Sequence, residues 1–333
     1  MQQLYPMKFH PVFREKIWGG QKINRILDLG CPYEARCGEA WLISGVAGDE
    51  TTVAQGFLKD NELNELVEVY MGELVGEQVF EKYGNEFPVL VKVIDANDWL
   101  SIQVHPDDEL ALRRHGSQGK TEMWYILDSD EDSVLISGFG KKVDKKEYLR
   151  HLQNNTLKEI LNFEAARPGD VFYIPSGRVH ALGPGIMLAE IQQTSDITYR
   201  IYDWDRISEA GVKRELHTDQ ALDAIDFGVH ENYRTEYKKE KDKTSNILVS
   251  PYFTVNMLSL NLPVRKDYAE LDSFVIYMCV DGKAIVRSLD TETTFDRGEA
   301  ILLPAVAGTA EIHPLPGAEI LEIYMNTENP GKE

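Results

Sequence analysis

The chain has 333 residues, 43% of them hydrophobic, which is ordinary for a globular protein with one large core or two closely joined domains. Its formal net charge of −20 argues against nucleic acid and anionic membrane surfaces as partners, because both would repel it. No apolar stretch is long enough to span a membrane and the first residues lack a secretion signal, so we expect a cytoplasmic protein that does not bind membranes.

The N-terminal part of the chain predicts strands followed by a helical insertion. Residues 9–44 alternate short apolar runs with glycine and other turn residues, as strands and loops do. Residues 60–84 carry apolar side chains at helical spacing, with a glycine near each break, and predict an inserted helical segment. Cys31, Cys37 and Cys279 are too few and too irregularly spaced for a disulfide framework, so all three are expected to be reduced.

The middle of the chain returns to strands that are interrupted by helices. The runs FPVLVKVIDAN and WLSIQVHP predict two strands, and Asp107 is placed to cap a short helix after Pro106. The acidic run at 128–133 lacks the ligand spacing of a calcium loop and is expected to be a solvated hairpin tip. The sequence further predicts a second helical insertion at 144–163, strands at 171–174 and 186–191, a helix at 215–227, a polar linker at 236–246 and short strands over 252–324.

A short pattern occurs twice in the chain. GDVFYIP at residues 169–175 and GEAILLP at 298–304 each combine glycine, an acidic residue, apolar residues and proline, and each follows an aromatic-rich strand. A repeated β unit of this kind predicts two related sheet structures rather than one large sheet. After the proline the copies diverge, with His180 in the first where Thr309 stands in the second. The first unit alone is therefore expected to carry a polar function.

The surroundings of His180 resemble the second sequence motif of cupins, which are small antiparallel β-barrels of jelly-roll type that hold a metal inside. Gly169, Pro175, Gly177 and His180 match that motif at every position. Proline and glycine force a tight turn at the rim of the barrel, and the next strand then begins with the histidine facing inward. A lone histidine is more often structural, so a metal site requires partners for it.

Two other predicted strands offer such partners. Gln103 and His105 occupy alternate positions in LSIQVHP and therefore share one face of a strand. Glu122 opens the strand EMWYIL, where a carboxylate is costly to bury unless it is paired or binds a cation. With His180 these residues form an oxygen and nitrogen set suited to Zn²⁺ or another divalent first-row ion. The alternative is that Gln103 and Glu122 only form hydrogen bonds in the mouth of a barrel.

Several motifs in order resemble one family, type I phosphomannose isomerase in its short bacterial form. They are KIWGG, QVHP, GKTE, the PxGxxHA turn and EIQQTSDITYRIYDWDR, and the resemblance runs from Pro11 to about Tyr324. It implies a zinc-dependent aldose–ketose isomerase, with one Zn²⁺ per chain, that interconverts mannose 6-phosphate and fructose 6-phosphate. By the same resemblance the metal ligands are Gln103, His105, Glu122 and His180, and an active-site arginine is Arg200.

Aldose–ketose isomerisation needs a group that moves a carbon-bound proton, and two residues are candidates for it. Glu190 lies on the predicted strand that follows His180, and Lys120 shortly precedes Glu122. Either could be the proton shuttle, and Lys120 could instead bind phosphate or orient a hydroxyl. Arg200 is expected to stabilise the ene-diolate or to bind the phosphate, because its guanidinium suits oxyanions.

Each of these three residues also has a structural interpretation. Lys120 and Arg200 could be surface charges paired with Asp203 or Asp205. Glu190 could instead fix the tautomer of His180. The sequence leaves these alternatives open.

The fold expected from these observations is mainly β, with two cupin (jelly-roll) units and helical insertions. The metal-bearing catalytic unit is expected at 1–240 and a degenerate cupin-like unit at 247–333. A metal-dependent cupin oxygenase and a non-catalytic sugar-binding cupin are the alternative functions. Lys120 and Arg200 favour an isomerase with a phosphosugar substrate, because an apolar oxygenase pocket has no need of cations.

Overall fold

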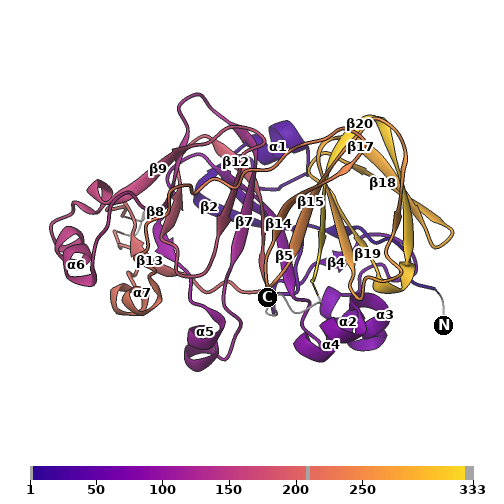
Figure 1. Cartoon of the computed structure of the whole chain (residues 1–333), viewed down its shortest axis with the longest axis horizontal. Helices are drawn as coiled ribbons and strands as arrows, with labels where there is room; N and C mark the ends of the chain where they lie inside the picture. The colour runs from indigo at the N-terminus through magenta and orange to yellow at the C-terminus, as the bar shows by residue number, and fades with distance from the viewer. Residues whose placement is uncertain (1–2, 208–210, 327–333) are drawn as a thin grey trace.

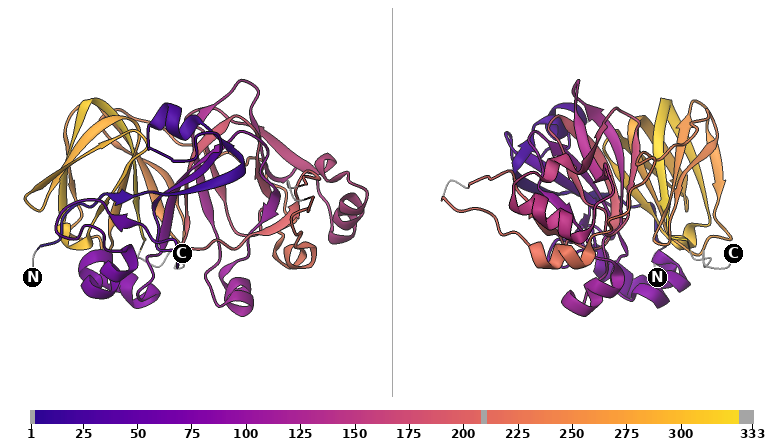
Figure 2. Two further views of the ribbon diagram at one scale, coloured as in Figure 1. Left: turned by 180° about the vertical axis from the view of Figure 1, so that it is seen from behind. Right: turned by 60° about the vertical axis from the view of Figure 1, so that its left-hand side comes forward.

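The computed structural model describes residues 3–207 and 211–326, and most of its secondary structure is β-strand. Figures 1 and 2 show two strand-rich units side by side along the longest axis, with the short helices at their edges. The predicted architecture of two cupin-like β units with helical insertions is thereby confirmed. No helix in the described part of the chain is long and apolar enough to cross a membrane.

Two antiparallel sheets form the first unit. The six-stranded sheet has the order β10-β7-β12-β5-β2-β3, and the five-stranded sheet has the order β13-β6-β11-β8-β9. The first sheet contains β2 (Val12–Gly20), β3 (Cys37–Ile43), β5 (Val89–Ala96), β7 (Glu122–Ser129), β10 (Val171–Ile174) and β12 (Ile186–Gln193). The second contains β6 (Ile102–Val104), β8 (Val134–Phe139), β9 (Leu161–Ala165), β11 (His180–Leu182) and β13 (Tyr199–Tyr202).

Strand β5 is buried along its whole length, and the alternation of its side chains decides what each face contacts. Val91 and Val93 join a core shared with the C-terminal unit. Ile94 joins a different core, which also contains Leu182 of the second sheet and so lies between the two sheets of the first unit. Lys92 shares that inner face, although it is charged and its neighbours along the strand are apolar.

The C-terminal unit is a seven-stranded antiparallel sheet. An N-terminal segment packs against it, because Met7 forms a bridge to Leu302, and the nearby β1 (Phe9–His10) pairs with β4 (Thr52–Val53). The division of the chain into a catalytic unit at 1–240 and a C-terminal unit at 247–333 stays a prediction. The strands of the C-terminal sheet are β14 (Thr244–Val249), β15 (Thr254–Leu260), β16 (Val264–Asp267), β17 (Val275–Ser288), β18 (Thr291–Asp296), β19 (Ala300–Leu303) and β20 (Thr309–Tyr324).

The two copies of the repeated pattern occupy corresponding places in the two units. β10 pairs antiparallel with β7, the aromatic-rich strand before it, and β19 pairs in the same way with β17. His180 is the first residue of β11, and Thr309 is the first residue of β20. The prediction of two related sheet structures is confirmed, and the divergence falls at the start of the strand that follows each turn.

Most of the predicted helices are present, although their ends differ from the predictions. Residues 60–84 form α2 (Leu63–Tyr70), α3 (Gly72–Val75) and α4 (Glu77–Tyr83), which lie together at one edge of the molecule (Figure 1). The helix after Pro106 is α5 (Asp108–His115), and the Asp107 side chain accepts a hydrogen bond from Leu110 N at 2.8 Å, as predicted. The remaining helices are α6 (Lys145–Gln153), the 3-10 helix η1 (Leu157–Glu159), α7 (Thr218–Ala224) and the 3-10 helix η2 (Ala305–Ala307).

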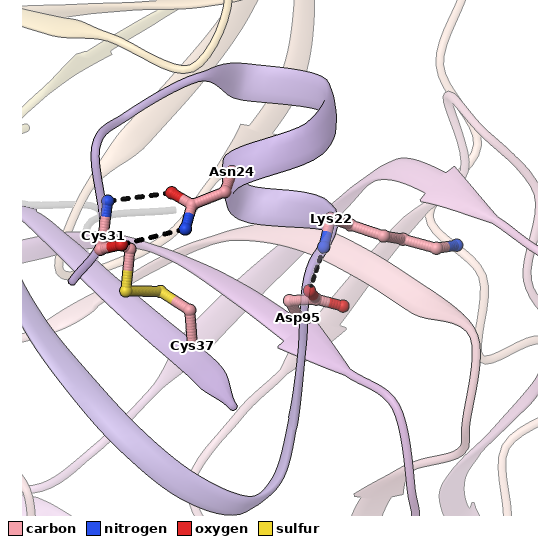
Figure 3. Close-up of a disulfide and its surroundings, with 5 residues drawn as sticks. All are labelled: Lys22, Asn24, Cys31, Cys37 and Asp95. Atoms are coloured by element: carbon pink, nitrogen blue, oxygen red, sulfur yellow. Dashed lines mark hydrogen bonds between the residues drawn. A yellow bond between two sulfur atoms is a disulfide. The ribbon is translucent and has the colours of Figure 1, made fainter. Parts of the chain in front are cut away.

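Two of these expectations need correction. The insertion predicted at 144–163 ends early, because β9 already begins at Leu161 and pairs with β8. Residues 9–44 were expected to form strands and loops throughout, whereas Lys22–Leu27 form the helix α1. The start of this helix is held from elsewhere in the chain, since Lys22 N donates to Asp95 Oδ2 of β5 at 2.5 Å (Figure 3).

Cys31 and Cys37 form a disulfide, so the prediction of reduced cysteines is wrong for these two (Figure 3). Their Cα atoms lie 6.4 Å apart, within the range that a disulfide spans. Asn24 of α1 fixes the same loop, because its amide donates to Cys31 O at 2.9 Å and accepts from Cys31 N at 2.8 Å. Cys279 is buried and free.

Candidate metal centre

Three predicted metal ligands meet between the two sheets of the first unit. His105 directly follows β6, Glu122 opens β7 and His180 opens β11. One ligand atom from each lies within 4.8 Å of the others, and every one of the three residues is only 1% exposed. Gln103 joins them from β6, since its Cα pairs with that of His180 in the sheet. The structure therefore brings all four predicted ligands together.

The turn before His180 positions two of the ligands at once. Gly177 has φ +86°, which is strained for a residue with a side chain, and a Cβ there would also meet Ala224 O at 3.0 Å. Its N–H donates to His105 O at 2.9 Å, which ties the turn to the segment that carries the other histidine. The Pro-Ser-Gly turn thus links the two segments that carry the histidines.

Both histidines have a defined tautomer. His105 Nδ1 donates to Ile197 O at 2.8 Å, and His180 Nδ1 donates to Arg178 O at 2.8 Å. A carbonyl oxygen only accepts hydrogen bonds, so each Nδ1 carries the proton and each Nε2 presents a lone pair. Backbone carbonyls commonly orient metal-binding histidines in this way. The alternative that Glu190 fixes the His180 tautomer is wrong.

The charges at the centre fit a bound cation. His105 Nε2 lies 3.1 Å from Glu122 Oε1, and His180 Nε2 lies 3.8 Å from Glu122 Oε2. That Oε2 atom is buried and has no hydrogen-bond partner among the described residues. The Lys120 ammonium contacts Glu122 Oε1 and lies 3.2 Å from His105 Nε2, so a cationic group already stands beside two of the ligands. Two imidazole lone pairs and a carboxylate with a free oxygen are a donor set that Zn²⁺ accepts.

Burial and the neighbouring charges set the protonation states that such a site requires. Burial, followed by the Lys120 ammonium, lowers the pKa of His105 to about 4. Burial likewise lowers the pKa of His180. Burial alone would raise the pKa of Glu122, but the Lys120 ammonium beside it outweighs burial and brings that pKa well below its usual range. Neutral imidazoles and an ionised carboxylate are the forms that ligate a metal.

Gln103 is the fourth predicted ligand, and its amide lies beside His180. Its Nε2 lies 3.2 Å from His180 Nε2, and its Oε1 accepts from Ser101 Oγ at 3.2 Å. Rotating the amide by half a turn exchanges these two atoms without moving the rest of the side chain. The same position therefore offers the centre a neutral oxygen.

A cavity of about 530 Å³ opens beside this centre. It is large enough to enclose a sugar phosphate. The predicted residues on its wall are Gln103, Lys120, His180, Glu190 and Arg200. Lys120 lies just before the start of β7 rather than on the strand. Its side chain is buried and contacts Glu122, so the interpretation of Lys120 as a surface charge is wrong.

Glu190 lies in the middle of β12, with both carboxylate oxygens held by neighbours. Lys92 Nζ lies 2.7 Å from its Oε1, and Trp124 Nε1 donates to its Oε2 at 2.7 Å. The carboxyl group is buried against β5 on one side and β7 on the other. Its orientation is therefore fixed relative to Glu122, which precedes Trp124 on the same face of β7.

Arg200 belongs to the opposite sheet, where its Cα pairs with that of Gln103. Its Nη1 donates to Glu215 O at 2.9 Å, whereas its Nε is buried without a hydrogen-bond partner in residues 3–207 and 211–326. Burial, and then the nearby Arg214, lowers the pKa of Arg200. Two guanidinium groups consequently face this end of the cavity, and Arg214 has one carboxylate partner, Asp203, at 3.5 Å.

Among the residues of the cavity wall that were not predicted from the sequence, four form one connected group. They come from β3, β5 and β7, and each of them contacts either Glu190 or another of the four. A signal was present, because a lysine inside the apolar run VLVKVI is costly to bury without partners. The four residues are Glu39, Trp41, Lys92 and Trp124.

Comparison with known proteins agrees with this geometry. Residues 7–157 match the model of the catalytic domain of phosphomannose isomerase type I, and residues 243–314 match that of the mannose-6-phosphate isomerase cupin domain. Mannose-6-phosphate isomerase ManA of Bacillus subtilis is 34% identical over 306 residues, covering 90% of this chain and 93% of the relative. Mannose-6-phosphate isomerase of Streptococcus mutans is 35% identical over 301 residues, covering 90% of this chain and 92% of the relative.

Solved structures agree as well. The mannose 6-phosphate isomerase of Bacillus subtilis superposes with a TM-score of 0.85 at 32% identity, covering 96% of this chain and 99% of that one. A mannose 6-phosphate isomerase bound with zinc and yttrium superposes with a TM-score of 0.77 at 16% identity, covering 96% and 99%. At 16% identity, the second match is evidence for the fold alone.

Proposed function

The chain belongs to the type I phosphomannose isomerase family, and on that premise we propose which of its residues carry out the isomerisation of mannose 6-phosphate to fructose 6-phosphate. The enzyme is a zinc-dependent aldose–ketose isomerase. The observation that carries the assignment is the buried cluster of His105, Glu122 and His180, in which both imidazoles present Nε2 toward one carboxylate.

Gln103, His105, Glu122 and His180 are the proposed ligands of one Zn²⁺ ion per chain. Both imidazoles are held by backbone carbonyls, and the carboxylate has an oxygen free for coordination. When bound, Zn²⁺ supplies Lewis-acid stabilisation of the negative charge that develops on the two oxygens of the reacting carbons. The same charge would be much more costly in this buried site without a cation.

Glu190 is the proposed group that moves the carbon-bound proton. In the aldose the proton leaves C2, an ene-diol forms, and a proton returns to C1. A carboxylate can accept and return it, and the pairing of both Glu190 oxygens keeps the group at the cavity wall. Meanwhile a proton must pass between O2 and O1. Lys120 is the proposed donor to these oxygens, because its ammonium lies beside two metal ligands.

Arg200 is proposed to bind the phosphate together with Arg214. The two side chains line the cavity on the five-stranded sheet side, and guanidinium groups match phosphate oxygens with paired N–H donors. Its Nε has no hydrogen-bond partner in the part of the chain that the structure describes, which leaves Arg200 with a donor for the substrate. An oxygenase acting on an apolar substrate would have no use for this pair.

Arg200→Ala is expected to retain zinc and to lower kcat/KM by about 10- to 100-fold, the value of one or two charge-assisted hydrogen bonds. The measurement is the kinetics of mannose 6-phosphate conversion, with inorganic phosphate as a competitor. The phosphate role requires that inhibition by inorganic phosphate weaken in the variant. Unchanged inhibition together with unchanged kcat/KM would remove Arg200 from the site.

The experiment that tests the function is conversion of mannose 6-phosphate by the purified protein, before and after chelation and after zinc is added back. We expect conversion to vanish on chelation and to return with zinc, because the side chains of the proposed ligands cannot themselves act as the Lewis acid. Zinc-loaded protein that converts no mannose 6-phosphate but consumes oxygen would indicate the oxygenase alternative. Sugar binding without turnover would indicate the binding module.

A cytoplasmic location is also proposed. Support comes from the substrate, because a phosphorylated sugar is an anion that membranes retain in the compartment where it is made. The Cys31–Cys37 disulfide would there face reducing conditions, which disfavour disulfides. The disulfide joins the loop after α1 to the start of β3, and neither cysteine lines the cavity.

A further inference from the structure

A row of four side chains crosses the six-stranded sheet at the level of the proposed proton shuttle. Trp41 of β3 is the Cα partner of Lys92 on β5, and Lys92 is the Cα partner of Glu190 on β12. Glu190 is in turn the Cα partner of Trp124 on β7. All four side chains line the same cavity, so neighbouring positions of four strands face the substrate side.

Lys92 stands between two carboxylates of this wall. Its Nζ lies 2.7 Å from Glu190 Oε1, and the side chains of the pair are only 9% and 3% exposed. On the other side is Glu39, which accepts from Trp41 Nε1 at 2.7 Å and lies 3.3 Å from Lys16 Nζ. Glu190 therefore has Lys92 and the Trp124 N–H as partners, whereas Glu39 has Lys16 and the Trp41 N–H.

The two lysines Lys16 and Lys92 balance the two carboxylates Glu39 and Glu190, and this keeps Lys92 in its cationic form. Burial works against the ammonium, but Glu190 and then Glu39 outweigh it and raise the pKa of Lys92. Burial also works against the Glu39 carboxylate, whereas Lys92 and Lys16 lower its pKa. Glu190 Oε1 is buried and has no hydrogen-bond partner within the described residues, so the Lys92 ammonium at 2.7 Å is what offsets its burial. Without that ion pair the carboxylate would turn toward any other partner it can reach.

We infer that Lys92 is a positioning residue that holds the Glu190 carboxylate in the orientation needed for proton transfer. The inference rests on the role proposed for Glu190 above. Trp124 fixes one oxygen of the carboxylate, and Lys92 fixes the other, so together they define its plane and its distance from the cavity. A shift of the base by about 1 Å is enough to slow a reaction roughly 100-fold, so the contacts that support the base matter for the rate.

The test is a double-mutant cycle on the zinc-loaded enzyme. Lys92→Met is expected to lower kcat for mannose 6-phosphate by about 10- to 100-fold, the usual effect of removing a supporting partner, with KM and zinc content little changed. Lys92→Arg, which keeps the cation, is expected to retain more of the activity and also serves where Lys92→Met does not fold. Because Lys92 acts through Glu190, adding either change to Glu190→Gln should lower kcat no further.

A matched control exists in the C-terminal unit. Lys266 lies 2.8 Å from the buried Glu322, with side chains that are 15% and 1% exposed, and this pair is outside the cavity. Lys266→Met should lower the midpoint of thermal unfolding and leave kcat of the folded enzyme unchanged, which separates loss of stability from loss of positioning.

The outcomes distinguish this inference from the assignment on which it rests. Glu190→Gln with full kcat would overturn both. A strongly impaired Glu190→Gln together with a fully active Lys92→Met would overturn only the role of Lys92. Multiplicative losses in the double variant would likewise overturn it, since they would mean that Lys92 acts independently of Glu190.

Discussion

His180→Ala is expected to lose zinc and isomerase activity together. The substitution removes a buried imidazole whose Nδ1 is already committed to Arg178 O, so its Nε2 is the atom that faces the centre. Without it, Glu122 and His105 remain but the ligand set is incomplete. We expect turnover to fall by at least about 10²- to 10³-fold, because the stabilisation of developing negative charge goes with the metal.

Metal content and turnover measured on the same preparation check this result. His151→Ala is a suitable control, because His151 of α6 is also buried but lies away from the cavity. Its Nδ1 forms a hydrogen bond with Thr156 Oγ1 at 2.8 Å. The control should keep both zinc and activity. A metal-free His180→Ala with normal turnover would contradict the metal centre altogether.

Glu190→Gln is expected to keep zinc and lose most of its turnover. The amide has the size of the carboxylate but cannot take up a proton, so kcat should fall by about 10²- to 10⁴-fold, the usual contribution of a positioned general base, while KM changes little. Exchange of deuterium from solvent into the sugar, measured with the same variant, should slow in parallel. Both readouts report the proton step itself.

The matched control for this variant is again in the C-terminal unit. Glu322 is fully buried and paired, as Glu190 is, but lies outside the cavity, so Glu322→Gln should affect stability and leave kcat unchanged. If Glu190→Gln turns over at the normal rate, Lys120 becomes the proton shuttle. Lys120→Met should then show the loss of exchange that was expected of Glu190.

The metal centre was predictable because its signals are local. The turn before His180 is encoded by a few consecutive residues. Gln103 and His105 are two residues apart, so strand geometry alone places their side chains on one face. Once an apolar strand carried Glu122 at its start, the cost of burying a charge indicated a cation. Each of these arguments uses a short segment, and the structure brings those segments together.

The row that contains Lys92 could not be predicted in the same way, because it depends on register between strands that are far apart in the chain. Neither Trp41 nor Glu190 is near Lys92 in sequence, and a shift of one residue in either pairing would turn the partner to the other face. The helix α1 is a similar case, since the Asp95 carboxylate that caps it comes from β5. The sequence around α1 contains no comparable capping residue of its own.

The second insertion ended differently from the prediction for another reason. Its helical spacing continued past Gln153, but Leu161 to Ala165 pair with β8 at the edge of the five-stranded sheet. Strand pairing and burial there outweigh the local preference of the segment, as tertiary contacts often do. The disulfide was not predicted either, because the spacing of Cys31 and Cys37 does not indicate how the loop between them brings them together.

The correspondence between His180 and Thr309 bears on the history of this chain. The C-terminal sheet repeats the strand, turn and strand of the first unit, yet the described residues from 244 to 324 contain no group of three potential metal-binding side chains. Two copies descended from one ancestral unit would explain this, with the architecture inherited by both and the chemistry kept by one. The strand, turn and strand of this unit can thus be built without a cluster of metal-binding side chains.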